Sequence, residues 1–90
     1  MAALLITYDL NAPGQNYTGL HEEIKVLGTA WWHYLESTWI VQTTLTPREA
    51  AQRLKAKMDD SDNLLVLDIT GDTHGGWLEK DAWEWINKNV

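Results

Sequence analysis

Residues 4–9, Leu4-Leu5-Ile6-Thr7-Tyr8-Asp9, have the composition of a central β-strand, since they are aliphatic, β-branched or aromatic up to the last position. The strand ends in a carboxylate, and a polar loop follows over residues 10–16. A carboxylate at the end of a buried strand, beside a loop with Gly and Pro, is a common position for chemistry. Alternatively, Asp9 only begins a turn, by accepting hydrogen bonds from backbone N–H groups between Asn11 and Gly14. Both interpretations of Asp9 are open on the sequence.

The composition is that of a single globular domain over residues 1–90. Hydrophobic residues make up 44% of the chain, which argues against disorder, and no apolar run approaches the ~18 residues of a membrane span. The N-terminal residues lack the basic region of a signal peptide. There is no Cys to form a disulfide framework or a thiolate zinc site. We therefore expect a cytoplasmic protein with no membrane partner.

Local signals predict the next three elements. Apolar residues at helical spacing predict a helix over residues 17–27, with Gly28 as its C-terminal cap. Two β-prone runs, residues 29–35 and 38–44, are separated by a two-residue break and predict a hairpin.

A second helix is predicted to begin at Thr46-Pro47-Arg48-Glu49, which contains a capping residue, a first-turn proline and the glutamate of a capping box. The acidic run over residues 59–63 lacks the Gly and the distal Glu of an EF-hand, so we interpret it as a solvated helix end. A fourth strand over residues 64–70 and a short C-terminal helix capped by Asp81 complete the chain.

This order, β-α-β-β-α-β followed by a helix, predicts an α+β fold of the ferredoxin-like type. We expect a four-stranded antiparallel sheet, in the order 4-1-3-2, with both main helices on one face. Period-two alternation then places Leu4, Ile6 and Tyr8 toward the helices. In the fourth strand, Leu65, Leu67 and Ile69 are expected on that same side. The residues expected on the other face of the sheet are Leu5, Thr7, Asp9, Leu64, Val66 and Asp68.

Both faces of every predicted strand carry large apolar side chains, so something is expected to cover the face opposite the helices. A second copy of the chain is the most economical cover and predicts a homodimer. The C-terminal helix with Trp83 and Trp85 is the competing cover. The chain has six Trp, a residue type enriched at interfaces, and this also favours a partner subunit.

The net charge of −6 disfavours nucleic acid as a partner, because attraction to phosphates needs clustered Lys and Arg. The only basic residues close together are Arg48, Arg53, Lys55 and Lys57, and their spacing spreads them around the exposed surface of a helix. We interpret them as a solvated face.

Several motifs carry a resemblance to a known family. Three runs resemble a group of small bacterial and phage proteins labelled "SinR family": Tyr8-Asp9-Leu10-Asn11-x-Pro13-Gly14-Gln15-x-Tyr17, Trp31-Trp32-His33-Tyr34-Leu35-x-Ser37-Thr38-Trp39 and Gly76-Trp77-Leu78. Over residues 3–70 the chain also resembles the CRISPR-associated Cas-two proteins and their VapD toxin relatives. The resemblance implies a ferredoxin-like homodimer whose sheets pack on each other. In nuclease-active relatives the matching aspartate, Asp9 here, comes from both subunits and holds a divalent metal, Mg²⁺ or Mn²⁺, at the dimer axis.

The sequence departs from those relatives in its charges, and this ranks two hypotheses. The relatives follow their aspartate with a basic loop, whereas residues 11–16 contain no Lys or Arg. A phosphodiester hydrolase needs positive charge to stabilise its transition state. The first hypothesis is therefore a homodimeric interaction or scaffold module with little or no catalysis. The alternative is a metal-dependent endoribonuclease, either an interferase-like toxin or a nucleic-acid-processing subunit, with Asp9 as catalytic residue and metal ligand.

Beside Asp9, five residues are candidates for loop or ligand roles: Tyr8, Asn11, Gln15, Asn16 and His33. The three loop amides can bind a ligand or brace the loop, and bracing is favoured. His33 can act as a general base, but a hydrogen-bonded histidine within an aromatic cluster is the favoured interpretation. No two histidines have the spacing of a metal-binding pair on one helix.

Overall fold

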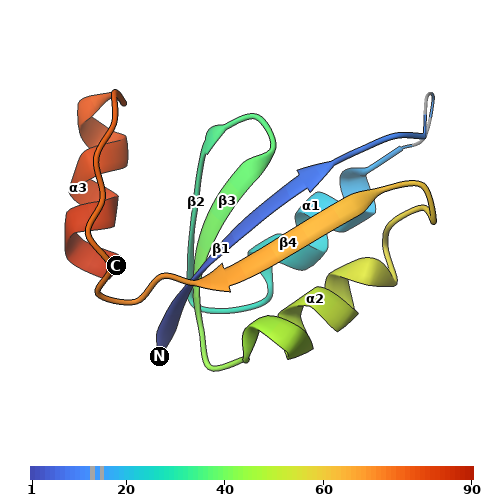
Figure 1. Ribbon diagram of the computed structural model, residues 1–90, viewed down its shortest axis with the longest axis horizontal. Helices are drawn as coiled ribbons and strands as arrows, with labels where there is room; N and C mark the ends of the chain where they lie inside the picture. Colours follow the sequence, from blue (N-terminus) through green and yellow to red (C-terminus); the bar gives the residue numbers. More distant parts are fainter. Residues whose placement is uncertain (13, 15) are drawn as a thin grey trace.

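The computed structural model describes residues 1–12, 14 and 16–90. The described residues form four strands and three helices in the predicted order (Figure 1). Their bounds are β1 Ala2–Asp9, α1 Thr18–Lys25, β2 Ala30–Leu35, β3 Thr38–Thr43, α2 Pro47–Lys55, β4 Asn63–Asp68 and α3 Lys80–Asn89.

The four strands form one antiparallel sheet in the order β2-β3-β1-β4, which confirms the predicted topology. β1 pairs with β3 on one side and β4 on the other, so the first strand is central, as its composition indicates. α1 and α2 lie together on one face, and α3 lies on the opposite side of the sheet (Figure 1). The fold is thus α+β of the ferredoxin-like type.

The main core fills the space between the sheet and the first two helices. Leu4, Ile6 and Tyr8 of β1 point into it, as predicted, and the side chains of Trp39 and Val41 come from β3. The helices contribute these buried residues: Leu20, Ile24, Ala50 and Leu54. At about 25 cal/mol per Å² of buried apolar area, each buried Leu, Ile or Val of this core stabilises the fold by ~1.5–3 kcal/mol.

The expected faces of β4 were wrong. Leu64 and Val66 pack against the main core, whereas Leu65 and Leu67 are 52% and 46% exposed on the other face. The register explains this, because Leu67 lies opposite Leu5, and directly opposed residues share a face. A shift of one residue in the expected pairing exchanges the two faces of a strand.

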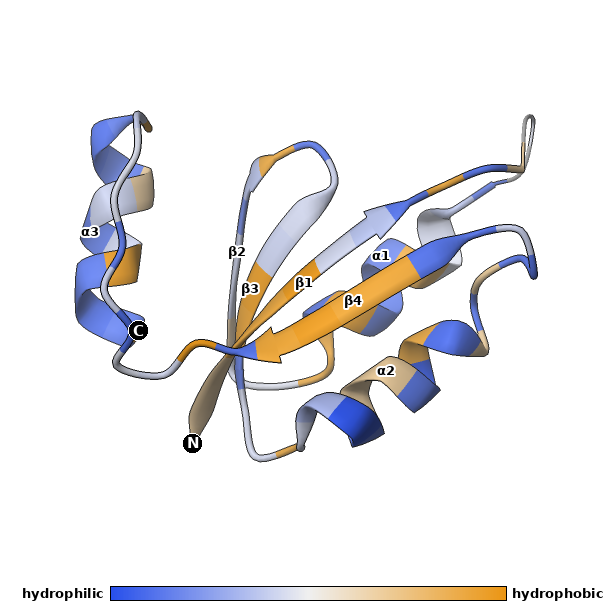
Figure 2. Cartoon of the chain, in the orientation of Figure 1, coloured by the Kyte–Doolittle hydropathy of each residue, from blue (hydrophilic) through white to orange (hydrophobic). Residues whose placement is uncertain are grey.

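α3 covers only part of the face opposite the main helices. Ala82 and Ile86 of α3 pack on Ala3, Trp32 and Ile40, and the Trp32 Nε1–H donates to the Ala82 carbonyl oxygen at 3.1 Å. The competing cover named from the sequence, the C-terminal helix, therefore exists over the β2 side. On the β4 side Leu65 and Leu67 stay exposed, and β4 is apolar along most of its length (Figure 2).

Two local predictions had different outcomes. Thr46 caps α2 as predicted: its hydroxyl accepts from Glu49 N–H at 3.1 Å, and the Glu49 carboxylate accepts from Thr46 N–H at 3.0 Å. Gly28, however, is not the residue that ends α1, which stops at Lys25 with Val26 as its C-cap. A Cβ at Gly28 would lie 1.7 Å from the Gln42 carbonyl oxygen, so this position is Gly because the loop runs against β3.

In the described part of the chain, none of the helices has the length and apolar character needed to cross a membrane.

Candidate functional site

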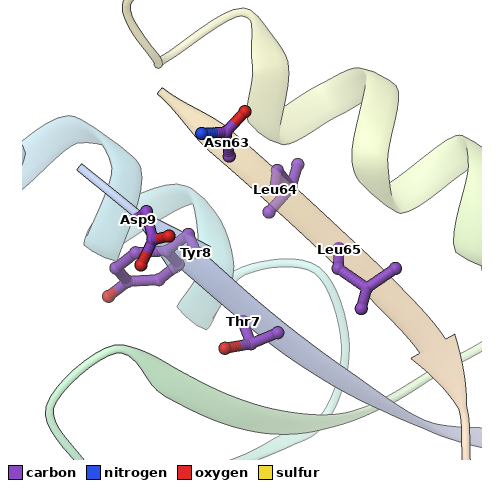
Figure 3. Close-up of a pocket in the computed structure, with 6 residues that line it drawn as sticks. All are labelled: Thr7, Tyr8, Asp9, Asn63, Leu64 and Leu65. Atoms are coloured by element: carbon purple, nitrogen blue, oxygen red, sulfur yellow. The ribbon is translucent and has the colours of Figure 1, made fainter. Parts of the chain in front are cut away.

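Asp9 is exposed at the end of β1, where Asn63 of β4 lies opposite it. The two strands border a shallow hollow of about 180 Å³ on this part of the surface (Figure 3). Its lining residues are Thr7, Tyr8, Asp9, Asn63, Leu64 and Leu65. Asp9 is therefore accessible to a ligand or a partner chain.

Asp9 also borders a second hollow of about 350 Å³, between the end of β1, α1 and the β2–β3 turn. This hollow brings Asp9 close to Glu36 and His21, and its full lining is Tyr8, Asp9, Leu10, His21, Glu36 and Ser37. Among the described residues, however, no three His, Cys, Asp or Glu side chains are arranged to hold a metal ion.

Among the described residues the Asp9 carboxylate makes no hydrogen bond, so the interpretation of Asp9 as the start of a turn receives no support from them. Pro13 and Gln15 of the same loop lie outside the described residues. Another carboxylate organises the loop. Asp62 Oδ1 accepts from Asn11 N–H at 2.6 Å and from the Tyr17 hydroxyl at 2.8 Å, and its Oδ2 accepts from Asp59 N–H at 2.8 Å.

Asp62 is the exception to the interpretation of residues 59–63 as solvated: its side chain is buried, whereas Asp60, Ser61 and Asn63 are exposed. Burial alone raises the pKa of this carboxyl, but the hydrogen bonds from Asn11, Asp59 and Tyr17 outweigh it, so the pKa of Asp62 lies below its ordinary value. Sequence reasoning missed this residue because an acidic run on the surface and a carboxylate that bridges two loops look alike without the fold.

Two of the three candidate loop amides brace their own surroundings. The Asn11 side-chain amide donates to the Ser61 carbonyl oxygen at 3.0 Å, and the Asn16 side-chain oxygen accepts from Thr18 N–H at 2.9 Å. Gln15, the third, lies outside the described residues. Asn11 and Asn16 are both exposed.

Tyr8 and His33 belong to an aromatic cluster at the same end of the sheet. His33 stacks on Trp39 with ring centroids 3.7 Å apart and planes inclined by 11°. Trp39 Nε1–H donates to the Tyr8 hydroxyl at 3.0 Å, and that hydroxyl is 3.3 Å from His21 Nε2. His33 is half-buried, its Nε2 is 3.1 Å from the Glu36 carbonyl oxygen, and it lines neither hollow beside Asp9.

The surroundings of this cluster shift the pKa values of Tyr8 and His21. Burial raises the pKa of the Tyr8 phenol; the Trp39 hydrogen bond opposes this, and the Glu36 charge adds to it. Burial also lowers the pKa of His21, and the charges of His33 and Lys25 lower it further. The neutral forms of Tyr8 and His21 are therefore favoured, with the Tyr8 hydroxyl free to donate to His21 Nε2. This arrangement rigidifies the end of the sheet.

A third hollow, of about 500 Å³, lies between α2 and β4 and was not anticipated from the sequence. Arg48 and Lys55 from α2 stand on its sides, and the remaining lining residues are Ala51, Gln52, Met58, Asp62, Asn63 and Leu64. Arg48, Gln52 and Lys55 recur at i, i+4 and i+7, which places them on one helix face beside the outer strand. We call this hollow the α2–β4 groove. Arg53 points elsewhere and pairs with Glu23 of α1 at 2.7 Å.

Comparisons with known proteins identify no relative: neither a protein-family model, nor a curated protein, nor a solved structure matches the chain. The chemistry of the site is thus argued from its own residues. They comprise one accessible carboxylate, a buried aromatic cluster, an exposed apolar strip on β4 and a groove with two cationic side chains.

Proposed function

We propose that this protein is a small homodimeric interaction or scaffold module with the Cas-two-like ferredoxin fold and little or no catalysis. The observation that carries the proposal is the exposure of Leu65 and Leu67, 52% and 46%, on the part of the sheet that α3 leaves uncovered. Adjacent apolar side chains on a sheet face are typical of an interaction surface. A second copy supplies a matching apolar surface without requiring another gene product.

The charge distribution supports an interaction role over catalysis. No Lys or Arg lines either of the two hollows beside Asp9, so neither supplies the positive charge that stabilises phosphoryl transfer. With a net charge of −6 on each copy, long-range electrostatics oppose association. Short-range contacts between the two copies must therefore provide the attraction.

Light scattering coupled to gel filtration tests the proposal. At micromolar concentration the wild type is expected at twice the chain mass of 10.3 kDa. Leu67→Asp is expected to give a folded monomer, because it places a charge in the apolar strip. Val26→Asp is the matched control, since Val26 is 62% exposed at the end of α1, away from the sheet. A wild type that stays at 10.3 kDa would refute the proposal.

A metal-dependent endoribonuclease is the second candidate, and the accessible Asp9 carboxylate favours it. Because one chain offers too few ligands, this activity requires Asp9 from both subunits near a dimer axis, with Mg²⁺ or Mn²⁺ bound between them. The purified protein is incubated with labelled RNA and labelled DNA with either metal, beside Asp9→Asn. Cleavage of RNA that disappears in Asp9→Asn would establish the enzyme; uncleaved RNA at enzyme-like protein concentrations would exclude it.

A further inference from the structure

β4 is an edge strand with one row of backbone groups free to pair. It hydrogen-bonds to β1 alone, and Ile69 N–H donates to the Ala3 carbonyl oxygen at 2.9 Å. Because hydrogen-bonded pairs alternate along an antiparallel ladder, Leu67 and Leu65 are the next residues whose backbone groups face β1. It follows that the N–H and C=O groups of Leu64, Val66 and Asp68 point away from the sheet.

The apolar part of this edge lacks three of the devices that keep strands apart: a Lys, a Pro and a bulge. The run Leu64-Leu65-Val66-Leu67 contains no Lys and no Pro, and the β1–β4 register is continuous, without a bulge. The opposite edge differs: β2 has a register irregularity between Trp32 and Leu35, and α3 packs beside it. β4 is therefore the edge on which another strand can be added (Figure 1).

Two-fold symmetry selects one register for pairing β4 with a second β4. If the two β4 strands pair in antiparallel fashion, the two-fold axis that relates them is perpendicular to the sheet. The helices α1 and α2 of both copies then lie on the same side of the joined sheet. If the axis passes through Val66, the backbone groups of Leu64, Val66 and Asp68 can all hydrogen-bond to the partner strand. Val66 then lies opposite the partner's Val66, and Leu64 lies opposite the partner's Asp68. Shifting the axis by one residue in either direction leaves one of these residues unpaired.

The side chains agree with this register on both faces. On the exposed face, Leu65 meets the partner's Leu67, and the strip formed by Leu65 and Leu67 continues across the junction. On the helix side, this register would place Asp68 at the partner's α2–β4 groove beside Leu64; that groove is lined by the cationic Arg48 and Lys55 and by the carboxylate of Asp62. The Lys55 ammonium has only the exposed Asp60 as an ion-pair partner in the described chain, at 3.6 Å. Asp68 carries the opposite charge, and its Oδ2 makes no hydrogen bond among the described residues.

We propose that two copies join edge to edge through β4, in antiparallel register about a two-fold axis at Val66, to form one continuous sheet. This inference rests on the proposed homodimer and specifies its interface. In this dimer Asp9 lies on β1, one strand away from the interface, opposite Asn63, which is three residues from the axis at Val66. The two Asp9 residues are then about 24 Å apart. A shared metal at the axis is incompatible with this arrangement.

Disulfide trapping tests the register directly, because the natural chain has no Cys. Leu65 and the partner's Leu67 form a non-hydrogen-bonded pair, whose Cα separation of ~4.5 Å suits a disulfide. Chains with Leu65→Cys alone and Leu67→Cys alone are mixed, oxidised at micromolar concentration, and analysed by mass spectrometry. We expect mainly mixed disulfide dimers. Predominance of either homodimeric disulfide would overturn the register.

Sedimentation of further variants tests the edge and its charges. Val66→Pro removes an outward N–H without removing a bond to β1, so the monomer is expected to fold while the dimer weakens by roughly 30-fold or more, since two N–H groups are lost. Val66→Thr is the control and should leave the dimer within a few-fold. Asp68→Lys and Lys55→Asp are each expected to weaken the dimer, and the double variant that carries both changes is expected to restore it. If Asp68 has only a structural role within its own chain, the double variant will not restore the dimer.

The outcomes separate this inference from the proposed function. A dimer that is unaffected by Val66→Pro, with no recovery in the charge exchange, would overturn the edge interface while leaving the homodimer in place. A monomeric wild type would overturn both the edge interface and the proposed homodimer. The β4 edge would then be available to pair with an extended segment of another protein.

Discussion

The Tyr17 hydroxyl donates a hydrogen bond of 2.8 Å to Asp62 Oδ1 and thereby joins the β1–α1 loop to the α2–β4 turn. The same oxygen accepts from Asn11 N–H at 2.6 Å, so one carboxylate holds two segments that are about fifty positions apart in the chain. Burial and the Asp62 hydrogen bond both raise the pKa of the Tyr17 phenol, which keeps it a donor at neutral pH. The loop beside Asp9 is thus anchored from across the molecule.

Asp62→Asn is expected to lower the melting temperature at pH 7, because an amide cannot accept all the hydrogen bonds that the carboxylate accepts. The folded-state pKa of Asp62 is depressed, so its contribution to stability is fully present above the ordinary carboxyl pKa of ~3.9 and is lost as the pH falls through the lower folded value. Wild type and Asp62→Asn should therefore differ most at neutral pH and converge in acid. Asp60→Asn is the control, since Asp60 is exposed and should change little at either pH. A difference that persists unchanged in acid would contradict this role.

His21 predicts a second loss of stability at milder pH. Its folded-state pKa is lowered, so the unfolded chain binds a proton that the folded chain excludes, and stability falls as the pH drops below the ordinary histidine value of ~6.5. Protonation also removes the acceptor for the Tyr8 hydroxyl, which is 3.3 Å from His21 Nε2. We expect His21→Gln to flatten the change in urea midpoint between pH 7 and pH 5.5. An NMR titration midpoint for His21 at or above ~6.5 would contradict the prediction.

Gly28→Ala is expected to destabilise the fold by about 3 kcal/mol, the upper end of the cost of overpacking, or to prevent folding. The new Cβ would meet the Gln42 carbonyl oxygen, which is backbone and also accepts from Thr29 N–H at 2.9 Å, so it has little room to move. Gly19→Ala is the matched comparison. It lies in α1 with only Lys57 Cδ nearby, at 4.0 Å, and should stabilise by about 0.5–1 kcal/mol. Chemical denaturation measures both, and equal effects would refute this account of Gly28.

Trp32→Phe is expected to loosen α3 with little effect on the main core. The substitution removes the N–H that donates to the Ala82 carbonyl oxygen and keeps an aromatic ring over Ile40. The loss of one such bond costs ~1 kcal/mol, which should appear as faster hydrogen exchange in Lys80–Asn89 and unchanged exchange in β1. Uniform acceleration over the whole chain would show instead that α3 and the core unfold together.

Much of the fold could be predicted because its signals are local. The composition of residues 4–9, the capping box at Thr46 and the short break in the hairpin each depend on neighbouring residues only, and together they predict the order of elements and the central position of β1. What failed depends on contacts between distant segments. The faces of β4 follow from its register with β1, and the role of Gly28 follows from the approach of Gln42.

The candidate site was predictable only in part, for the same reason. The position of Asp9 at an accessible strand end follows from the length of the strand. Neither the bridging role of Asp62 nor the α2–β4 groove can be recognised without knowing that the turn before β4 packs beside the first loop and that α2 lies along β4.

The division of the sheet face between α3 and an exposed strip has a consequence for synthesis on the ribosome. All four strands and both main helices leave the exit tunnel before α3 does, so Trp32 and Ile40 lack their cover while the main core can already form. During that interval the nascent chain also exposes Trp32 and Ile40, in addition to the side chains of this face that stay exposed in the folded protein, such as Leu65 and Leu67. Chains in which Lys80–Asn89 has not yet emerged should therefore bind chaperones more strongly than chains in which α3 has packed on the sheet.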